Sequence, residues 1–585
     1  MNGFRVWAPL AGKVELIVGQ RRLHMDKDAA GYWSATVADT GPGTDYAFSV
    51  DGSPPRPDPR APWFPTGVFG PARVVDHAAF PWTDGAFRPP SLGDGVIYEL
   101  HIGTFTRQGT FDAARERLSE LCELGITHVE IMPVAAAPGA RGWGYDGVGL
   151  YAPSESYGGP EGLRRFVDAC HGSGLAVLLD VVYNHLGPSG NFLGTFGPYF
   201  TDRYATPWGQ AVNLDGPHSD EVRRFFIDNA CMWLRDYHID GLRLDAVHAL
   251  TDQSAVHFLE ELGSAVDALS DQTGRLLSVI AESDLNDSRL VRSPDAGGYG
   301  LAAMWSDDFH HALHAVISGE RTGYYEDFGH LWDVAKALRS GLVYDGVYSR
   351  HRGRRHGRPL GGVGGRRLVG FLQNHDQVGN RARGERLHHL ADLERVKAGA
   401  ALVLTGPFVP LLFQGEEWAA SSPFAYFTDH QDPELGQAVR EGRRREFAAF
   451  GWRPEEIPDP QALETFRRSQ LDWSERLQTP HLETLAFYRA LVALRRERPE
   501  LRDGRFDRIA VSVDESAGWL AMARGDVLVV SAFGESPLDL SVQRLPRPSA
   551  LDDRPFRLQL GSRPGVSFDG DKLHLPAPSA AVLLR

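Results

Sequence analysis

Cysteine is scarce in this sequence. The 585 residues include only three cysteines, Cys122, Cys170 and Cys231. An odd number of widely spaced cysteines cannot build a disulfide framework, and the spacing differs from that of zinc ligands. We therefore expect the three cysteines to be small buried apolar side chains.

Long apolar runs and a leader segment are also missing. No stretch of 18 consecutive apolar residues occurs, so no segment is expected to span a membrane. The first ten residues show no basic segment followed by an apolar core, which predicts that no signal peptide is present. These absences favour a cytoplasmic protein.

Positive charge is in short supply as well. Lys and Arg number 61 against 76 Asp and Glu, which gives a formal net charge of −15. Nucleic-acid binders usually carry a basic face, and an anionic membrane gives an acidic chain no attraction, so neither is an expected partner. The negative net charge neither attracts nor repels a neutral substrate. The hydrophobic fraction of 42% is ordinary for a globular protein and excludes a mainly disordered chain.

The hydrophobic pattern divides the chain into three predicted domains, residues 1–85, 86–495 and 496–585. Short alternating strands separated by glycine-rich turns predict a β-sandwich in the first domain, similar to carbohydrate-binding modules. Strands return in the last domain and predict an antiparallel β-domain. The predicted strands of these two domains are residues 4–8, 14–18, 46–50, 509–513, 527–530 and 580–584.

In the middle domain, short apolar runs alternate with longer segments of helical period. Near-continuous apolar runs are typical of parallel strands that are buried on both faces. Eight such runs predict an α/β fold, a (β/α)8 TIM barrel with insertions. The longest gap, residues 183–238, predicts an inserted subdomain. The predicted barrel strands are residues 96–100, 128–132, 175–179, 241–244, 276–280, 301–305, 368–372 and 408–413.

Charged residues follow four of these strands, where a TIM barrel carries its active site. Asp245, Glu282 and Asp376 follow the fourth, fifth and seventh strands. Burying a charge at such a position costs free energy unless the charge is solvated, paired or needed for function. A purely structural cluster is the alternative, and it applies best to Asp180, which could form a buried ion pair with Arg243 that closes the top of the barrel.

Two carboxylates are the minimum set for glycoside cleavage, one as nucleophile or base and one as proton donor. Arg243 lies on the same strand face as Asp245 and can keep that carboxylate ionised, as a nucleophile requires. Glu282 stands beside two other carboxylates, which should raise its pKa, as a proton donor requires. Asp376 could hold ring hydroxyls and stabilise the positive charge that develops on the sugar.

Other residues near these strand ends suit a sugar. Tyr145, in the segment Gly-Trp-Gly-Tyr-Asp after the second strand, is expected to contact the substrate, because sugar rings pack their apolar faces on aromatic side chains. His185 and His375 stand beside the predicted acids and are expected to bind hydroxyls. Residues 310–314 carry three histidines at metal-like spacing, but no glutamate stands in the metalloprotease position. The arginine-rich residues 350–367 predict a solvated or mobile loop.

At these residues the chain resembles the α-amylase superfamily, glycoside hydrolase family 13. The four motifs that carry the resemblance stand in order at residues 180–185, 241–248, 280–284 and 373–376. The resemblance implies retaining cleavage through a covalent glycosyl-enzyme. It implies that Asp245 is the nucleophile, Glu282 the general acid/base and Asp376 the transition-state stabiliser. The implied substrate-binding residues around them are Tyr145, His185, Arg243 and His375.

Within the superfamily, three stretches resemble the trehalohydrolases: residues 281–287, residues 304–314 with 319–325, and residues 412–418. This resemblance implies hydrolysis of the α-1,4 bond next to the terminal trehalose of malto-oligosyltrehalose, with related α-glucans as further substrates. It also suggests functional coupling to a malto-oligosyltrehalose synthase, which would supply the substrate. The residues expected to read the trehalose end or to contact the substrate near it are Trp305, Asp307, Asp308, His310, His248 and Glu417.

One departure and two alternatives accompany this interpretation. Many α-amylases bind calcium through an asparagine that Asn184 matches, but the other ligands are not identifiable, so neither a metal nor a cofactor is predicted. A glycogen branching or debranching enzyme shares the N-terminal β-domain and the barrel, although the sequence around the sixth strand disfavours it. A catalytically silent glucan-binding protein is disfavoured by the three carboxylates.

Overall fold

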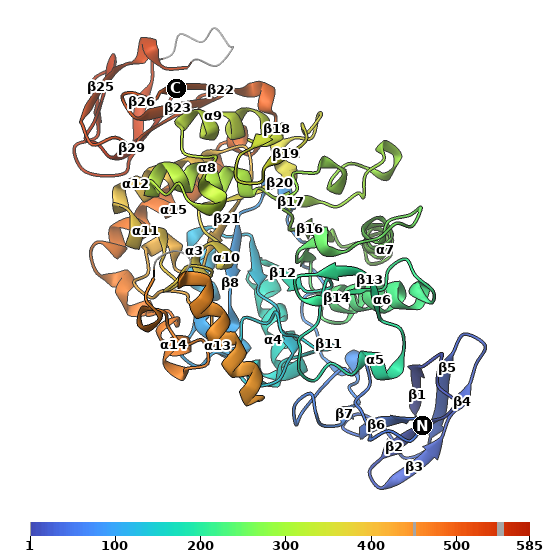
Figure 1. Cartoon of the computed structure of the whole chain (residues 1–585). Helices are drawn as coiled ribbons and strands as arrows, with labels where there is room; N and C mark the ends of the chain where they lie inside the picture. Colours follow the sequence, from blue (N-terminus) through green and yellow to red (C-terminus); the bar gives the residue numbers. More distant parts are fainter. Residues whose placement is uncertain (1, 449–451, 547–554) are drawn as a thin grey trace.

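The apolar runs of the middle region form a closed barrel of eight parallel strands in the computed structural model, which describes residues 2–448, 452–546 and 555–585 (Figure 1). This confirms the predicted TIM barrel, because every strand overlaps one of the predicted runs. In chain order the strands are β8 (Ile97–Leu100), β9 (His128–Ile131), β12 (Ala176–Val181), β15 (Gly241–Leu244), β16 (Ser278–Ala281), β17 (Ala303–Trp305), β20 (Leu368–Phe371) and β21 (Val409–Phe413).

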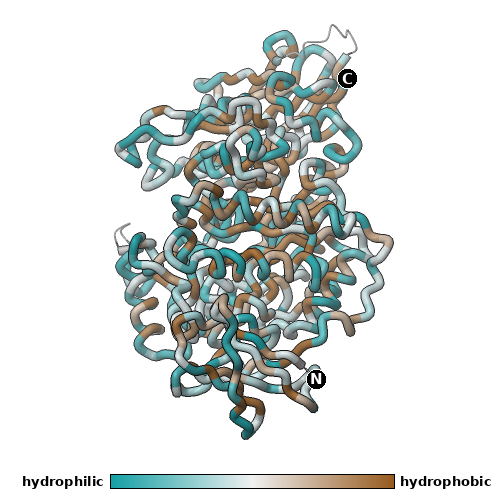
Figure 2. Tube along the Cα trace, turned by 90° about the vertical axis from the view of Figure 1, so that its right-hand side faces the viewer, coloured by the Kyte–Doolittle hydropathy of each residue, from teal (hydrophilic) through white to brown (hydrophobic). Residues whose placement is uncertain are grey.

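Amphipathic helices cover the outside of the barrel. In α6, for example, Val222, Phe225, Phe226 and Trp233 recur at helical spacing and are buried, whereas the opposite face is polar. The apolar outer faces of the strands pack against these helices in one continuous core. The long covering helices are α4 (Gly159–Gly172), α6 (Ser219–Asp236), α7 (Phe258–Thr273), α8 (Asp307–Ser318), α12 (Leu393–Thr405) and α15 (His481–Glu497). Figure 2 shows hydrophobic segments inside this region and hydrophilic segments along the outer loops.

The interior of the barrel changes character along its axis. Its lower part is an apolar cluster that includes Ile97, Leu178, Ile280, Val369 and Leu411. Nearer the carboxyl ends of the strands, the inward positions become charged, and Glu99 pairs in register with Glu130 and Asp180 with Arg243. Since buried charge is costly, this upper layer must be paired, neutral or functional.

The N-terminal domain consists of two antiparallel sheets, as predicted. They enclose a core that includes Phe4, Val6, Leu16 and Phe48. The sequence pattern missed the middle strand of the first sheet, β5, because Tyr32 and Trp33 are adjacent buried aromatics and do not alternate. The sheets are β1 (Asn2–Trp7), β5 (Tyr32–Val37) and β4 (Asp26–Lys27), and β3 (Arg21–His24), β2 (Val14–Val18), β6 (Asp45–Val50) and β7 (Ala72–Arg73).

The C-terminal domain is also antiparallel and lies at the opposite end of the molecule (Figure 1). Its larger sheet packs on α12, where the Ser531 hydroxyl donates a hydrogen bond to the carbonyl of Ala398. The larger sheet contains β22 (Ile509–Asp514), β23 (Trp519–Arg524), β24 (Val527–Ala532), β29 (Ser579–Leu584) and β26 (Arg557–Gly561), and the smaller one β25 (Leu538–Ser541), β28 (Lys572–Leu575) and β27 (Ser567–Phe568).

Two expectations about loops need correction. Residues 183–238 hold a short helix, α5 (Leu193–Phe196), and a hairpin of β13 (Phe200–Thr206) and β14 (Gly209–Val212) before the barrel helix α6, so the insertion is smaller than a subdomain. The arginine-rich segment is partly ordered by backbone pairing, because β18 (Asp345–Ser349) and β19 (Arg354–Gly357) form a second hairpin. Among the helices of the described residues, none has the length and apolar character needed to cross a bilayer.

A buried arginine joins the C-terminal sheet to the barrel. Arg524 of β23 is 2% exposed and donates four hydrogen bonds to backbone carbonyls, two of them at the C-terminal end of α12. These carbonyls lie at a helix end and a connecting loop, and one of them, that of Gly406, also accepts a hydrogen bond from Arg495 at 3.0 Å.

We predict that Arg524→Leu destabilises the protein by about 2 kcal/mol or more, because buried carbonyls lose their donors. The measurement is the midpoint of urea unfolding. Arg508→Leu is the matched control, because its side chain is 61% exposed and makes an ion pair with Asp503 at 3.4 Å; a change within about 0.5 kcal/mol is expected there. Equal effects of the two substitutions would contradict the bridging role of Arg524.

Candidate active site

The structure brings the three predicted carboxylates together at the carboxyl ends of the barrel strands. Asp245 directly follows β15, Glu282 follows β16, and Asp376 lies in α10 (His375–Gly379) after β20. Their side chains are 12%, 16% and 38% exposed. All three therefore reach solvent at the mouth of the barrel, while the residues that hold them are buried.

Arg243 is the buried centre of this arrangement, with no exposed surface. Its Nη1 donates to both carboxylate oxygens of Asp180, at 2.9 and 2.8 Å, and to Oδ1 of Asp245 at 2.9 Å. Its Nη2 lies 3.8 Å from Oε2 of Glu282. The predicted Asp180–Arg243 ion pair is thus present. One guanidinium neutralises a carboxylate below it and orients a second one above it.

Asp245 is held from a second side by Asn184. The Asn184 side-chain amide donates to Oδ2 of Asp245 at 2.7 Å and to the Asp245 carbonyl at 2.9 Å. With Arg243 on Oδ1, both carboxylate oxygens accept hydrogen bonds, which fix the direction in which the group points. Arg243 and Asn184 thus stabilise Asp245 as an oriented carboxylate.

This use of Asn184 does not fit a calcium site. Its amide nitrogen is committed to Asp245, and its oxygen contacts Nδ1 of His185. Calcium is ordinarily surrounded by six to eight oxygen ligands. Within the described residues, no group of three or more His, Cys, Asp or Glu side chains is placed to hold a metal ion. The residues around Asn184 therefore organise the acidic site itself.

Glu282 has the environment of a carboxylic acid that stays protonated. Burial, together with the charges of Asp245, Asp307 and Asp376, raises its pKa to about 8, against the opposing effect of Arg243. Its Oε2 accepts a hydrogen bond from the backbone N–H of Ala246. Ala246 has φ +41°, a left-handed conformation that non-glycine residues rarely adopt. This strained turn directs the N–H that follows Asp245 toward the neighbouring carboxyl.

A second buried chain of hydrogen bonds holds His375. Its Nδ1 lies 2.5 Å from Oε1 of Glu99, and its backbone N–H donates to Oε2 of the same carboxylate at 2.8 Å. Its Nε2 lies 2.6 Å from the hydroxyl of Tyr145, which itself donates to Asp180 at 2.6 Å. Burial would lower the pKa of His375, but Glu99 and Asp376 raise it to about 9. A doubly protonated ring donates at both nitrogens and satisfies every partner in this chain.

The remaining ring of the site, His185, lies on the other side of Asp245. Its Nε2 contacts the carbonyl of Tyr145 at 3.1 Å, and burial lowers its pKa. Its face stacks on the indole of Trp208, with ring centroids 4.6 Å apart and an interplanar angle of 7°. Trp208 lies in the turn between β13 and β14 and is 48% exposed. An exposed aromatic at the mouth of the site offers a flat surface to a sugar ring.

Two of the six residues expected near the trehalose end reach the surface. Asp307 begins α8 and is partly exposed; burial and the charges of Asp284 and Asp376 raise its pKa to about 7. His248 is exposed in the turn after Asp245. These two positions are compatible with direct contact to a bound sugar.

The structure places Asp308 and His310 in the interior, contrary to expectation. Asp308 accepts hydrogen bonds from the backbone N–H groups of Val343 and Tyr344 at 2.7 and 2.6 Å. His310 is fully buried, and its Nδ1 lies 2.9 Å from the carbonyl of Leu372. Because α8 begins at Asp307, these residues point toward the neighbouring loop and the core. They fix backbone segments near the site and do not reach its surface.

Trp305 and Glu417 are buried as well. Trp305 is 2% exposed, and its ring lies under the Arg243 guanidinium at 4.3 Å. Glu417 is 3% exposed and accepts a hydrogen bond from the hydroxyl of Tyr98 at 3.1 Å. Both residues pack inside the protein, where they could affect a ligand only through their neighbours.

Sequence reasoning missed three features of the site: the buried Glu99, the hydrogen bond from Asn184 to Asp245, and the exposed Trp208. Glu99 lies inside an apolar run, Val-Ile-Tyr-Glu-Leu, where a charge that nothing nearby explains is a recognisable signal. Trp208 precedes Gly209 in a hairpin turn, and only its exposure in the folded protein distinguishes it from a core tryptophan.

The fold and the arrangement of its carboxylates define an α-amylase-type glycoside hydrolase. The family model described as "Alpha amylase, catalytic domain" matches residues 84–195. A malto-oligosyltrehalose trehalohydrolase of Rhizobium sp. (strain M-11) is 50% identical over 99% of this chain and 97% of its own length. That of Arthrobacter ramosus is 53% identical over 92% of this chain and 93% of its own. The chain belongs to the malto-oligosyltrehalose trehalohydrolase family.

A solved structure agrees with this assignment at the level of the fold. The superposition on a crystal structure described as a putative alpha amylase from Salmonella typhimurium covers 100% of this chain and 97% of that chain. The TM-score is 0.88 and the sequence identity is 37%. The similarity therefore includes both β-domains as well as the barrel.

The Glu99–His375 contact can be tested by titration. In Glu99→Gln we predict that the pKa of His375 falls from about 9 toward the ordinary histidine value of about 6.5, because the ring loses its buried counter-charge. The measurement is NMR titration of protein labelled at histidine Cε1, with His375→Gln to assign the signal.

Glu130→Gln is the matched control. Glu130 lies beside Glu99 on the adjacent strand, is fully buried, and has no hydrogen-bond partner on either carboxylate oxygen within the described structure. Burial raises its pKa well above the usual range, so its replacement removes no charge. An unchanged His375 titration in Glu99→Gln, or an equal shift in both variants, would show that the contact does not set the protonation of this ring.

Proposed function

We propose that this protein hydrolyses the α-1,4-glucosidic bond next to the terminal trehalose unit of malto-oligosyltrehaloses and releases trehalose. The observation that carries the proposal is the near full-length similarity to enzymes of that name, together with an oriented carboxylate and a protonated one at the mouth of the same barrel. Plain α-glucans are slower substrates in this proposal, because they lack the terminal trehalose.

The reaction proceeds in two balanced steps with retention of configuration. Asp245 attacks the anomeric carbon of the sugar while Glu282 gives its proton to the glycosidic oxygen, so the bond to the trehalose unit breaks as the glycosyl-enzyme ester forms. Water then attacks the same carbon. Ionised Glu282 takes the proton of that water, and Asp245 leaves as a carboxylate. No oxidant, metal or cofactor takes part in either step as proposed.

The surrounding contacts support these roles. Arg243 and Asn184 hold the two oxygens of Asp245 and orient this carboxylate as the nucleophile. Asp376, the most exposed of the three carboxylates, faces the sugar and stabilises the oxocarbenium-like transition state. Arg243 acts through Asp245 and does not itself reach the substrate.

Hydroxyl and ring contacts complete the site. His185 and Tyr145 bind the sugar at the point of cleavage, and Trp208 stacks on a ring at the mouth. His375 is 1% exposed, and both of its ring nitrogens are engaged, so it holds Tyr145 from behind. Asp307 and His248 contact the trehalose end. Trp305, Asp308, His310 and Glu417 support this surface from behind.

We further propose that the chain is organised as domains 1–85, 86–495 and 496–585, and that it works in the cytoplasm in trehalose biosynthesis. The substrate must come from an enzyme that converts the reducing end of a glucan into trehalose, so a malto-oligosyltrehalose synthase is the expected functional partner. A shared substrate requires no complex between the two.

The pH dependence follows from the proton on Glu282. Because the pKa of Glu282 is about 8, the acid form exists below that pH, and kcat/KM should fall tenfold per unit as pH rises above about 8. The measurement is kcat/KM between pH 5 and pH 10. Asp307 titrates nearby, with a pKa of about 7, so Asp307→Asn is the control: it should keep an alkaline limb. If Asp307→Asn lost the alkaline limb, Asp307 and not Glu282 would be the group that causes it.

Product analysis on two substrates tests the reaction itself. One substrate is maltopentaose, and the other is a glucan of equal length ended by trehalose. We expect rapid release of trehalose from the second and slow cleavage of the first. Asp245→Asn should lose activity by about 10³-fold or more while it keeps fold and binding.

Each other outcome supports a different function. Equal cleavage of both substrates would indicate a general amylase. Branched products from amylose would indicate a branching enzyme. Binding without turnover would indicate a silent glucan-binding protein.

A further inference from the structure

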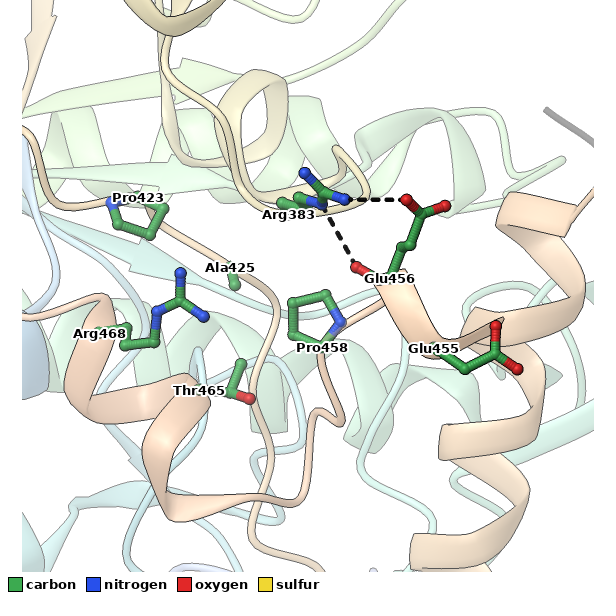
Figure 3. Close-up of a pocket in the computed structure, with 8 residues that line it drawn as sticks. All are labelled: Arg383, Pro423, Ala425, Glu455, Glu456, Pro458, Thr465 and Arg468. Atoms are coloured by element: carbon green, nitrogen blue, oxygen red, sulfur yellow. Dashed lines mark hydrogen bonds and ion pairs between the residues drawn. The ribbon is translucent and has the colours of Figure 1, made fainter. Parts of the chain in front are cut away.

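A cavity of about 360 Å³ opens beside the loops that follow the last two barrel strands (Figure 3). Arg383 belongs to the loop after α10, and Pro423 and Ala425 belong to the loop after β21. Opposite them lie η10 (Pro454–Glu456) and α14 (Leu463–Arg468). None of the three catalytic carboxylates lines this cavity.

The charges around the cavity sum to zero but are not all paired with one another. Arg383 contacts Glu456 through its side-chain oxygen and its carbonyl, both at 3.4 Å. Within the described parts of the chain, the side chains of Arg468 and Glu455 make no hydrogen bond or ion pair. Figure 3 shows the Arg468 side chain extending from α14 toward Pro423 and Ala425, with Pro458 on the far side of Ala425. The cavity thus presents unused donors without selecting for an ionic ligand.

Apolar surfaces lie next to these donors. The rings of Pro423 and Pro458 and the methyl group of Ala425 line the cavity beside Arg468. Polar groups next to small apolar faces suit a pyranose ring, which carries hydroxyls at its edge and C–H groups on its faces. The volume is at the small end of ligand pockets, about 300–1,000 Å³, so it suits one or two sugar units.

Packing connects the cavity to the reaction centre. The carbonyl of Ala425 accepts a hydrogen bond from the indole N–H of Trp143 at 3.1 Å. Trp143 stacks on Phe424 with centroids 5.2 Å apart, and its edge meets His375 at 5.7 Å. The backbone N–H of Phe424 donates to the carbonyl of Gly384, which joins the two loops. The cavity and the carboxylates therefore lie on the same end of the barrel, separated by this aromatic pair.

We propose that this cavity binds glucosyl units of the substrate's glucan chain at a distance from the bond that is cleaved, with Arg468 as the main hydrogen-bond donor. The inference rests on the proposed function, because that function supplies a neutral glucan long enough to reach past the site of cleavage. Such a site makes affinity depend on chain length and leaves the chemistry unchanged.

The test compares kcat and KM for trehalose-ended glucans of increasing length in four proteins: wild type, Arg468→Ala, Arg468→Lys and Arg467→Ala. For the longest substrates, Arg468→Ala should raise KM by about tenfold, the loss expected for a hydrogen bond to a charged group. The shortest substrate should show no change, and kcat should stay constant throughout. Arg468→Lys keeps the charge but loses the planar fork, so its effect should be intermediate.

Arg467 is the matched control, because it is exposed on the same helical turn and does not line the cavity. A second readout avoids turnover: in an Asp245→Asn background, maltoheptaose binding measured by calorimetry should weaken with Arg468→Ala but not with Arg467→Ala.

Failure of this proposal differs from failure of the proposed function. If wild type releases trehalose but Arg468→Ala and Arg467→Ala show the same length dependence and the same binding, the cavity holds no glucan. If wild type releases no trehalose, the proposed function fails, and calorimetry alone then decides whether the cavity binds glucan.

Discussion

Burial of a single guanidinium inside a barrel of parallel strands is the constraint on which the site depends. Arg243 has no exposed surface, and it contacts Asp180 and Asp245 through the same nitrogen. An unpaired charge at this depth would cost several kcal/mol, so the two carboxylates and the guanidinium stabilise one another as a set. Because the strands fix their backbones in register, the set also fixes where Asp245 points.

The same layer places two neighbouring acids in different environments. Asp245 accepts hydrogen bonds on both oxygens, whereas Glu282 is buried among other carboxylates and has its pKa raised to about 8. Two carboxyl groups on neighbouring strands thus differ in their surroundings: hydrogen bonds orient Asp245, and the environment of Glu282 raises its pKa, as a proton donor requires. The strained backbone at Ala246 belongs to this arrangement, since it directs an N–H from one acid's strand toward the other acid.

The sequence predicted the barrel well because strand burial leaves a local signal. Runs such as residues 408–413 are apolar on both faces, and the motifs that follow them placed Asp245, Glu282 and Asp376 at one end of the fold. Side-chain direction left no such signal. Trp305 and Asp307 are two residues apart, yet one packs under Arg243 and the other reaches solvent, because the start of α8 between them turns the chain.

Contacts between distant segments were equally invisible in the sequence. Glu99 and His375 are 276 residues apart, and Trp208 reaches His185 only through a hairpin whose length and register the pattern did not reveal. Residues of this kind are recognised only when the closed barrel places the first and seventh strands on the same ring.

The stack of Trp208 on His185 gives the protein an optical property. Of its 13 tryptophans, Trp208 is among the few that are strongly exposed, and its indole lies parallel to an imidazole that adjoins the acidic site. A histidine ring near an indole alters its emission, and a sugar that moves between the two rings or slides over the outer one changes that contact. We therefore expect a ligand at the barrel mouth to change the emission of Trp208, a label that the chain already contains.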